Sequence, residues 1–170
     1  MPNTFLRRAS HLREMSTQTR GKYYEELDVG DVYEHRPGRT VTEFDNTLWS
    51  LLSVNLQPLH LDAHYSAGTE FGQRLVNSML TLSTVVGLQV HDLTLGTTVA
   101  NLGFEEIAFP HPVFIGDTLY AETEVLDKRL SDSRDDSGIV TFEHRGHTQE
   151  GELVCECTRI ALMLLQPEDE

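Results

Sequence analysis

Polar side chains crowd a proline-containing turn in the segment Asn55-Leu56-Gln57-Pro58-Leu59-His60-Leu61-Asp62. His60 stands between two leucines, so we expect its ring in a partly apolar setting. There it would be neutral at about pH 7 and able to take or give a proton. A purely structural histidine, hydrogen-bonded within the turn, is the alternative. The segment therefore offers one candidate proton-transfer residue.

A second candidate is the pair Asn77-Ser78, where a strongly apolar run begins. If that run is a helix, its first turn leaves backbone N–H groups unpaired and carries a positive partial charge. Such an end can hold negative charge that develops on an oxygen, for example on a thioester carbonyl. Ordinary capping of the helix by either side chain is the alternative.

Two helices are expected to position these residues. Thr42 is typical of an N-cap, and the apolar spacing after it predicts an amphipathic helix over 43–54, broken by residues 55–58. The second helix is predicted over 75–90. Its apolar residues cover the whole helical wheel, which is typical of a helix in the middle of a fold. We also expect a turn at Pro37-Gly38.

From residue 96 onward the pattern is typical of strands. Alternating and β-branched residues predict strands over 96–109, 119–125, 140–145 and 152–165, with a polar hairpin loop at 131–138. Early helices followed by antiparallel strands indicate an α+β fold, in which the sheet wraps around the buried helix. Because one such sheet leaves an edge or a face exposed, we expect a homodimer.

The composition limits the class of protein. A chain of 170 residues, 39% of them hydrophobic, is enough for one globular domain, and no apolar run is long enough to span a membrane. A formal net charge of −14 makes nucleic acid an unsuitable partner. Cys155 and Cys157, the only cysteines, are poorly spaced for a disulfide and too few for a zinc site. We therefore expect no metal, reduced thiols and a cytoplasmic location.

Taken together, these residues resemble the MaoC-like dehydratases, which include the R-specific enoyl-CoA hydratases. The family signature D-x-N-P-x-H corresponds to N-L-Q-P-L-H at 55–60, and its H-G-M-L corresponds to N-S-M-L at 77–80. The segments A-G-T-E-F-G-Q-R at 67–74 and F-P-H-P-V-F-I-G-D-T-L at 109–119 are also family-like. Within the family, the sequence looks most like the branch of mesaconyl-CoA hydratase and methylmalyl-CoA dehydratase.

The resemblance implies a hotdog fold over residues 23–166, between a flexible N-terminal tail (1–22) and an acidic C-terminal tail (167–170). It also implies a dimer that binds acyl-CoA and reversibly adds water to a 2-enoyl thioester, with coenzyme A present only as part of the substrate. The catalytic histidine of the family falls on His60 and its aspartate on Asn55. The glycine whose N–H polarises the thioester falls on Ser78, beside Asn77. The expected pocket residues are Pro58, Asp62, Phe71, Arg74, Met79, Val99, Ala100 and Asn101.

Asn55 departs from the family pattern, because an amide cannot accept the proton that an aspartate can. His60 would then act both as base and as acid, with Asn55 only orienting the water. Alternatively, a nearby carboxylate takes over, or the protein binds acyl-CoA without turning it over. The carboxylates considered are Asp62, Glu70 and Asp45. A hotdog thioesterase is a further alternative, because a fold does not fix a function.

Overall fold

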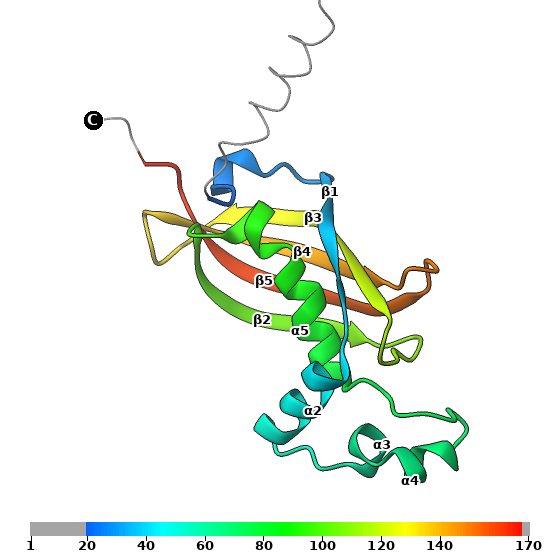
Figure 1. Cartoon of the computed structure of the whole chain (residues 1–170). Coiled ribbons are helices and arrows are strands. Elements are labelled where there is room, and N and C mark those ends of the chain that lie inside the picture. Colours follow the sequence, from blue (N-terminus) through cyan, green and yellow to red (C-terminus); the bar gives the residue numbers. More distant parts are fainter. Residues whose placement is uncertain (1–19, 168–170) are drawn as a thin grey trace, which may run out of the picture.

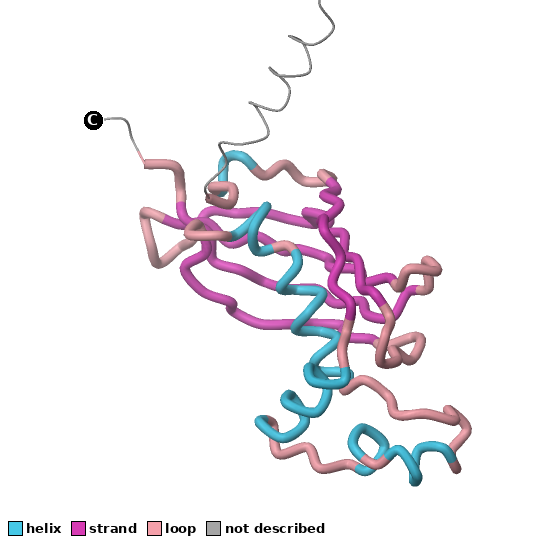
Figure 2. The backbone as a smooth tube through the Cα atoms, viewed as in Figure 1, coloured by secondary structure: helices cyan, strands magenta, loops and turns pink. Residues whose placement is uncertain are grey.

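Residues 20–167 are described by the computed structural model and form a five-stranded antiparallel sheet with one long helix against it (Figures 1 and 2). The strand order is β1-β3-β4-β5-β2, so β1 and β2 are the edges. The strands are β1 (Val32–Thr40), β2 (Thr98–Ala108), β3 (Thr118–Leu130), β4 (Ser137–His147) and β5 (Leu153–Leu164). The predicted α+β fold, with the sheet wrapped around a central helix, is confirmed.

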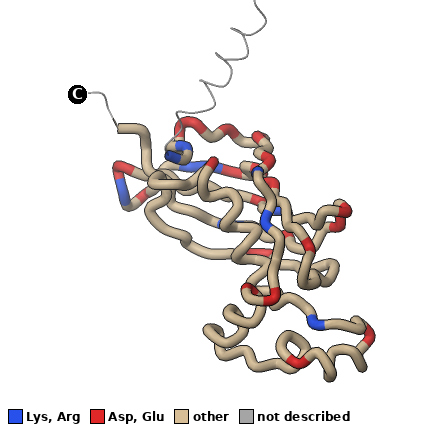
Figure 3. Tube along the Cα trace, in the orientation of Figure 1, with Lys and Arg blue, Asp and Glu red and all other residues tan. Residues whose placement is uncertain are grey.

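The central helix is α5 (Ser78–Leu88), which crosses the concave face of the sheet (Figure 1). Its Leu82 and Val85 pack with residues of β3 and β5 in one of the buried apolar clusters. A Cβ on Gly146 of β4 would lie 2.3 Å from a methyl carbon of Val85, so this close approach requires glycine. The helix carries no charged side chain, and the Asp and Glu residues of the described chain lie on the other elements and the loops (Figure 3).

Three shorter helices lie beyond the end of the sheet, next to the start of α5 (Figure 1). They are α2 (Glu43–Leu52), α3 (Pro58–Leu61) and α4 (Ala63–Ala67). Thr42 caps α2 as predicted, since its hydroxyl oxygen accepts a hydrogen bond from the N–H of Asp45. Pro58 occupies the first turn of α3, where its missing N–H costs nothing. Two single turns, η1 (Tyr24–Glu26) and η2 (Val90–Thr94), complete the helices of the described residues.

Several predicted boundaries differ from the observed ones. Pro37-Gly38 is not a turn but part of β1, where the pairing with β3 shifts between His35 and Arg39. The central helix begins at Ser78 rather than at residue 75. Residues 75 and 76 are extended instead: Leu75 bridges to Phe114, and the Val76 N–H donates to the carbonyl of Val113. Strands β3 and β4 are longer than predicted, which shortens the hairpin loop between them to residues 131–136.

The apolar side of α2 faces away from the rest of the described chain. Phe44 is 70% exposed and Leu52 74%, whereas the buried residues of this helix are Asn46 and Ser50. Trp49 of the same helix is only partly buried. Amphipathic spacing thus predicted the helix correctly, but the polar side of the helix is the one that meets the domain.

Both predicted tails lie mostly outside the described residues. Within the part that is described, the N–H groups of Gly21 and Lys22 donate to the carbonyls of Leu95 and Leu93 at 2.7 and 2.9 Å. These bonds attach the start of the described chain to the turn that follows α5. Among the helices of residues 20–167, none combines the length and the apolar character needed to cross a bilayer.

Candidate active site

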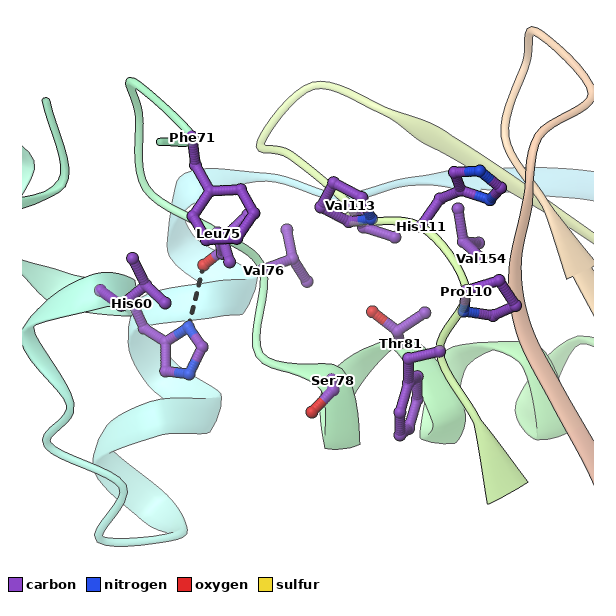
Figure 4. Close-up of a pocket in the computed structure, with 13 residues that line it drawn as sticks. His60, Phe71, Leu75, Val76, Ser78, Thr81, Pro110, His111, Val113 and Val154 are labelled. Atoms are coloured by element: carbon purple, nitrogen blue, oxygen red, sulfur yellow. Dashed lines mark hydrogen bonds between the residues drawn. The ribbon is translucent and has the colours of Figure 1, made fainter. Parts of the chain in front are cut away.

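A cavity of about 450 Å³ opens between the short helices and the start of α5 (Figure 4). It is lined by residues of α3, of the extended segment before α5, of the first turns of α5, of the segment after β2 and of β5. Most of these side chains are apolar. The complete lining is Leu59, His60, Phe71, Leu75, Val76, Ser78, Thr81, Phe109, Pro110, His111, Pro112, Val113 and Val154.

His60 is the titratable group at the α3 side of this cavity. Its Nδ1 lies 3.1 Å from the carbonyl oxygen of Leu75 (Figure 4). A carbonyl can only accept a hydrogen bond, so Nδ1 carries the hydrogen and Nε2 of the neutral ring keeps a free lone pair. The contact with a backbone atom therefore fixes the tautomer in which Nε2 is available as a base.

Asn46 holds the two halves of the site together from α2. Its Nδ2 donates to the carbonyls of His60 and Leu75, both at 3.1 Å. Its Oδ1 accepts from the backbone N–H of Asn77 at 2.8 Å. The side chain is fully buried, and these bonds use both of its hydrogens. One amide thus links the histidine, the carbonyl that orients the histidine, and the residue that caps α5.

The start of α5 lies across the cavity from His60 (Figure 4). Asn77 is the N-cap, and its Oδ1 accepts from the N–H of Met79 at 3.0 Å. Within residues 20–167 the N–H of Ser78 has no hydrogen-bond partner, although Ser78 lines the cavity. This N–H is a free donor at the positive end of an 11-residue helix. It can hold an oxygen on which negative charge develops.

Three of the predicted site residues line the cavity, namely His60, Phe71 and Ser78. Asn77 instead acts beneath it, as the helix cap. Asn55 is exposed outside the lining, and its Oδ1 accepts from the N–H of Gln57 at 3.3 Å. The role predicted for Asn55 in orienting water stays a prediction.

The other predicted pocket residues lie elsewhere. Pro58 starts α3, Asp62 caps α4 through the N–H of Tyr65, and Arg74 forms an ion pair with Glu43 at 2.6 Å. Val99, Ala100 and Asn101 belong to the edge strand β2, and Met79 faces a different cavity. None of the 13 lining residues is a carboxylate, so Asp62, Glu70 and Asp45 do not replace the missing aspartate within the lining.

Three polar residues at the site were not predicted from the sequence. Thr81 and His111 line the cavity, and the Nδ1 of His111 bonds the carbonyl of Leu153 at 2.9 Å. His111 lies in the family-like segment 109–119, which was a usable signal. Asn46 had none, because a single asparagine in a helix reads as a solvent-facing residue.

Comparison with known proteins shows which family this chain resembles. A family model described as a MaoC-like domain matches residues 26–147. A mesaconyl-CoA hydratase of Haloarcula marismortui is 30% identical over 141 residues, which is 83% of this chain and 39% of that protein. An (R)-specific enoyl-CoA hydratase of Aeromonas caviae is 37% identical over 105 residues, 62% of this chain and 73% of that protein. The chain thus spans about two fifths of the length of the mesaconyl-CoA hydratases that it matches.

The fold has a solved counterpart in a Mycobacterium tuberculosis protein described as having a double hotdog fold. It superposes with a TM-score of 0.76 at 24% identity, and the match covers 88% of this chain but 46% of that one. The expected hotdog architecture is therefore confirmed, and the present chain corresponds to one of two such units.

Proposed function

Because the chain belongs to the MaoC-like domain family, we propose that it adds or removes water across the 2,3 double bond of an enoyl-CoA thioester. One observation carries the proposal: the Nε2 side of His60 and the free N–H of Ser78 border the same apolar cavity. A proton acceptor and an oxyanion donor are the two groups that this reaction requires.

In the hydration direction, the thioester carbonyl accepts a hydrogen bond from the Ser78 N–H. Water attacks the β-carbon while Nε2 of His60 takes one of its protons, and negative charge builds on the carbonyl oxygen. The fixed N–H and the helix dipole stabilise that enolate without reorganising. The imidazolium then returns its proton to the α-carbon, so the net change is one water added. Dehydration runs the same steps backwards.

The cavity favours a short acyl group. Its walls come mostly from leucine, valine, phenylalanine and proline, and its volume of about 450 Å³ is within the range of small-molecule sites. Relatives of the chain are named mesaconyl-CoA hydratase and beta-methylmalyl-CoA dehydratase, and we propose a short branched dicarboxylic thioester of that kind as the substrate. The proposed reaction needs no cofactor apart from the coenzyme A that the substrate itself carries.

We further propose that two copies of the chain associate. The matched double-hotdog protein contains about twice the length of this unit, so a pair of copies would provide the equivalent arrangement. The edge strand β2 is available for such pairing because one of its sides has no neighbouring strand. We also propose a cytoplasmic location, in which the buried thiols of Cys155 and Cys157 would stay reduced.

The test is incubation of the purified chain with crotonyl-CoA and, separately, with mesaconyl-CoA. Loss of the enoyl absorbance without release of free thiol is the result expected of a hydratase. Thiol release would instead identify a thioesterase, and an unchanged spectrum with both substrates would contradict the proposal.

One observation favours a second function. Because no carboxylate lines the cavity, the lining has only histidines for proton transfer. A non-catalytic acyl-CoA-binding subunit would show tight binding of crotonyl-CoA in calorimetry and no turnover. In that case Asn55→Asp, which introduces a proton acceptor at the position where the resemblance places the family's aspartate, is the variant in which activity should appear.

A further inference from the structure

A second cavity, of about 420 Å³, lies against α5, and its lining includes neither His60 nor Ser78. Its walls are mostly apolar, but they contain one arginine, Arg159 of β5. The complete lining is Met79, Leu82, Ser83, Val86, Gly87, Gln89, Val90, Phe104, Ile107 and Arg159. The reaction proposed above uses none of these residues.

Arg159 is buried, with only 6% of its surface exposed. Its Nε donates to Oδ1 of Asn101 at 3.2 Å, and its Nη1 is buried without a hydrogen-bond partner. Burial lowers the pKa of this guanidinium, because the charged form loses its hydration. Even so, an arginine remains protonated in proteins. The cavity wall therefore contains a positive charge whose donors are only partly used.

Arg159 is also unusual among the arginines of residues 20–167. Each of the other seven has a carboxylate within ion-pair distance, and Arg159 alone has none, although the protein is strongly acidic. The titratable groups close to it are His144 and Cys157, neither of which is a carboxylate. An unpaired buried charge is costly, so this position calls for an anion. The paired arginines are Arg20, Arg36, Arg39, Arg74, Arg129, Arg134 and Arg145.

A second buried group of the same wall is also incomplete. Gln89 is 1% exposed, and its Nε2 donates to Oγ1 of Thr94 at 3.1 Å. Its Oε1 is buried and has no partner among the described residues. The lining therefore offers an unused donor from Arg159 and an unused acceptor from Gln89, both surrounded by apolar side chains.

We propose that this cavity binds a carboxylate with a short apolar tail, held by Arg159 through the carboxylate and by α5 and β2 along the tail. Gln89 offers an additional contact to a hydroxyl or N–H group on the ligand. The carboxylate is either a free short-chain acid or the distal end of a carboxylate-bearing acyl group on coenzyme A. This inference does not depend on the hydration reaction proposed above.

The first test uses pentanoate and its neutral analogue pentanamide with the full chain. We expect pentanoate to bind in calorimetry and to raise the Tm, and pentanamide to do so much less. Arg159→Met keeps the volume but removes the charge, and should weaken pentanoate binding by about 10- to 100-fold. The control Arg134→Met, in an exposed loop, should leave it unchanged.

The source of the carboxylate is distinguished by two saturated thioesters that cannot be hydrated, succinyl-CoA and butyryl-CoA. A preference for succinyl-CoA that disappears in Arg159→Met assigns the cavity to an acyl group. Pentanoate binding without such a preference assigns it to a free acid. If butyryl-CoA does not bind at all, the proposed acyl-CoA function is contradicted. The carboxylate site is then tested by the pentanoate experiment alone.

Two results would overturn the inference. One is equal binding of pentanoate by the wild type and by Arg159→Met. The other is dissociation of a dimer in Arg159→Met together with no pentanoate binding by the wild type, which would assign the counter-ion to a second copy of the chain. In the absence of ligand we expect Arg159→Met to be at least as stable as the wild type, because an apolar side chain replaces an unpaired charge.

Discussion

The side-chain amide of Asn46 donates a hydrogen bond to the backbone carbonyl of His60 at 3.1 Å, from a position 14 residues earlier in the chain. The same amide binds the carbonyl that orients the imidazole and the N–H of the residue that caps α5. The positions of both groups in the proposed mechanism, the His60 imidazole and the N–H at the start of α5, therefore depend on α2 as well as on their own helices. The distance between base and oxyanion donor is set through one buried side chain.

Asn46→Ala should lower kcat by about 10- to 100-fold with a smaller effect on KM, because a misplaced base and donor affect the transition state most. It should also cost about 2–4 kcal/mol of stability, since two backbone carbonyls and one backbone N–H each lose a hydrogen bond. Ser50→Ala is the matched control: Ser50 is buried on the same helix, and its hydroxyl has no partner. In addition, ¹⁵N NMR of His60 should show a mixture of tautomers in Asn46→Ala. A folded Asn46→Ala protein with normal kcat and a single tautomer would contradict the role.

His60→Ala should reduce turnover at least ~100-fold, because the proposed base and acid is lost. His111→Ala is the matched control, since His111 lines the same cavity and is also bonded to a backbone carbonyl through Nδ1. We expect His111→Ala to stay near the wild-type rate in the enoyl absorbance assay. Equal losses in the two variants would mean that the proton is shared between both histidines.

Ser78→Pro should remove the oxyanion donor while leaving the fold intact. Position 78 is the first residue of α5, where proline is well tolerated, and Asn77 already has the extended backbone that a residue before proline prefers. Loss of one such donor typically costs about 10²–10³ in kcat. Ser78→Ala keeps the N–H and should remain active. An active Ser78→Pro enzyme with an unchanged Tm would exclude the backbone donor from catalysis.

His144 should make the protein less stable in acid. Burial lowers its pKa to about 3, with further lowering by Arg159 and His35, and its Nδ1 lies 2.8 Å from Oγ1 of Thr123. The unfolded chain therefore binds a proton that the folded chain does not, from the ordinary histidine range down to about pH 3. This contribution to stability is complete above that range and decreases as the pH falls.

In urea titrations the contribution of His144 should approach ~1.4 kcal/mol per pH unit below about pH 6. His144→Gln should flatten that part of the profile. His147→Gln, on the same strand but partly exposed, should not. A wild-type profile as flat as that of His144→Gln between about pH 6 and 4 would contradict the assignment.

Most of the fold could be predicted because local patterns decide it. Thr42 and the apolar spacing after it define α2, and the alternation in residues 119–125 and 140–145 marks two sheet strands. The turn at Pro37-Gly38 failed for a non-local reason. Gly38 lies against the ring of Tyr120. The glycine therefore allows β1 and β3 to approach closely and does not reverse the chain direction.

The site was predicted only in part, for the same physical reason. His60 and Ser78 stand next to recognisable turns, and both line the cavity. The roles of Asn46 and Arg159 depend on hydrogen-bond partners 14 to 58 residues away, and no local sequence pattern indicates those partners. Hydrophobic periodicity predicts local structure, but it does not show which distant residue a single polar side chain will contact.

The carbonyl of Leu75 belongs to the main chain, so no exchange of side chain at position 75 can delete it. An alanine scan would pass over the atom that selects which nitrogen of His60 is the base, and natural drift at this position would leave that selection untouched. Only a change to the polymer itself, such as an ester in place of the peptide unit that follows Leu75, would weaken this acceptor.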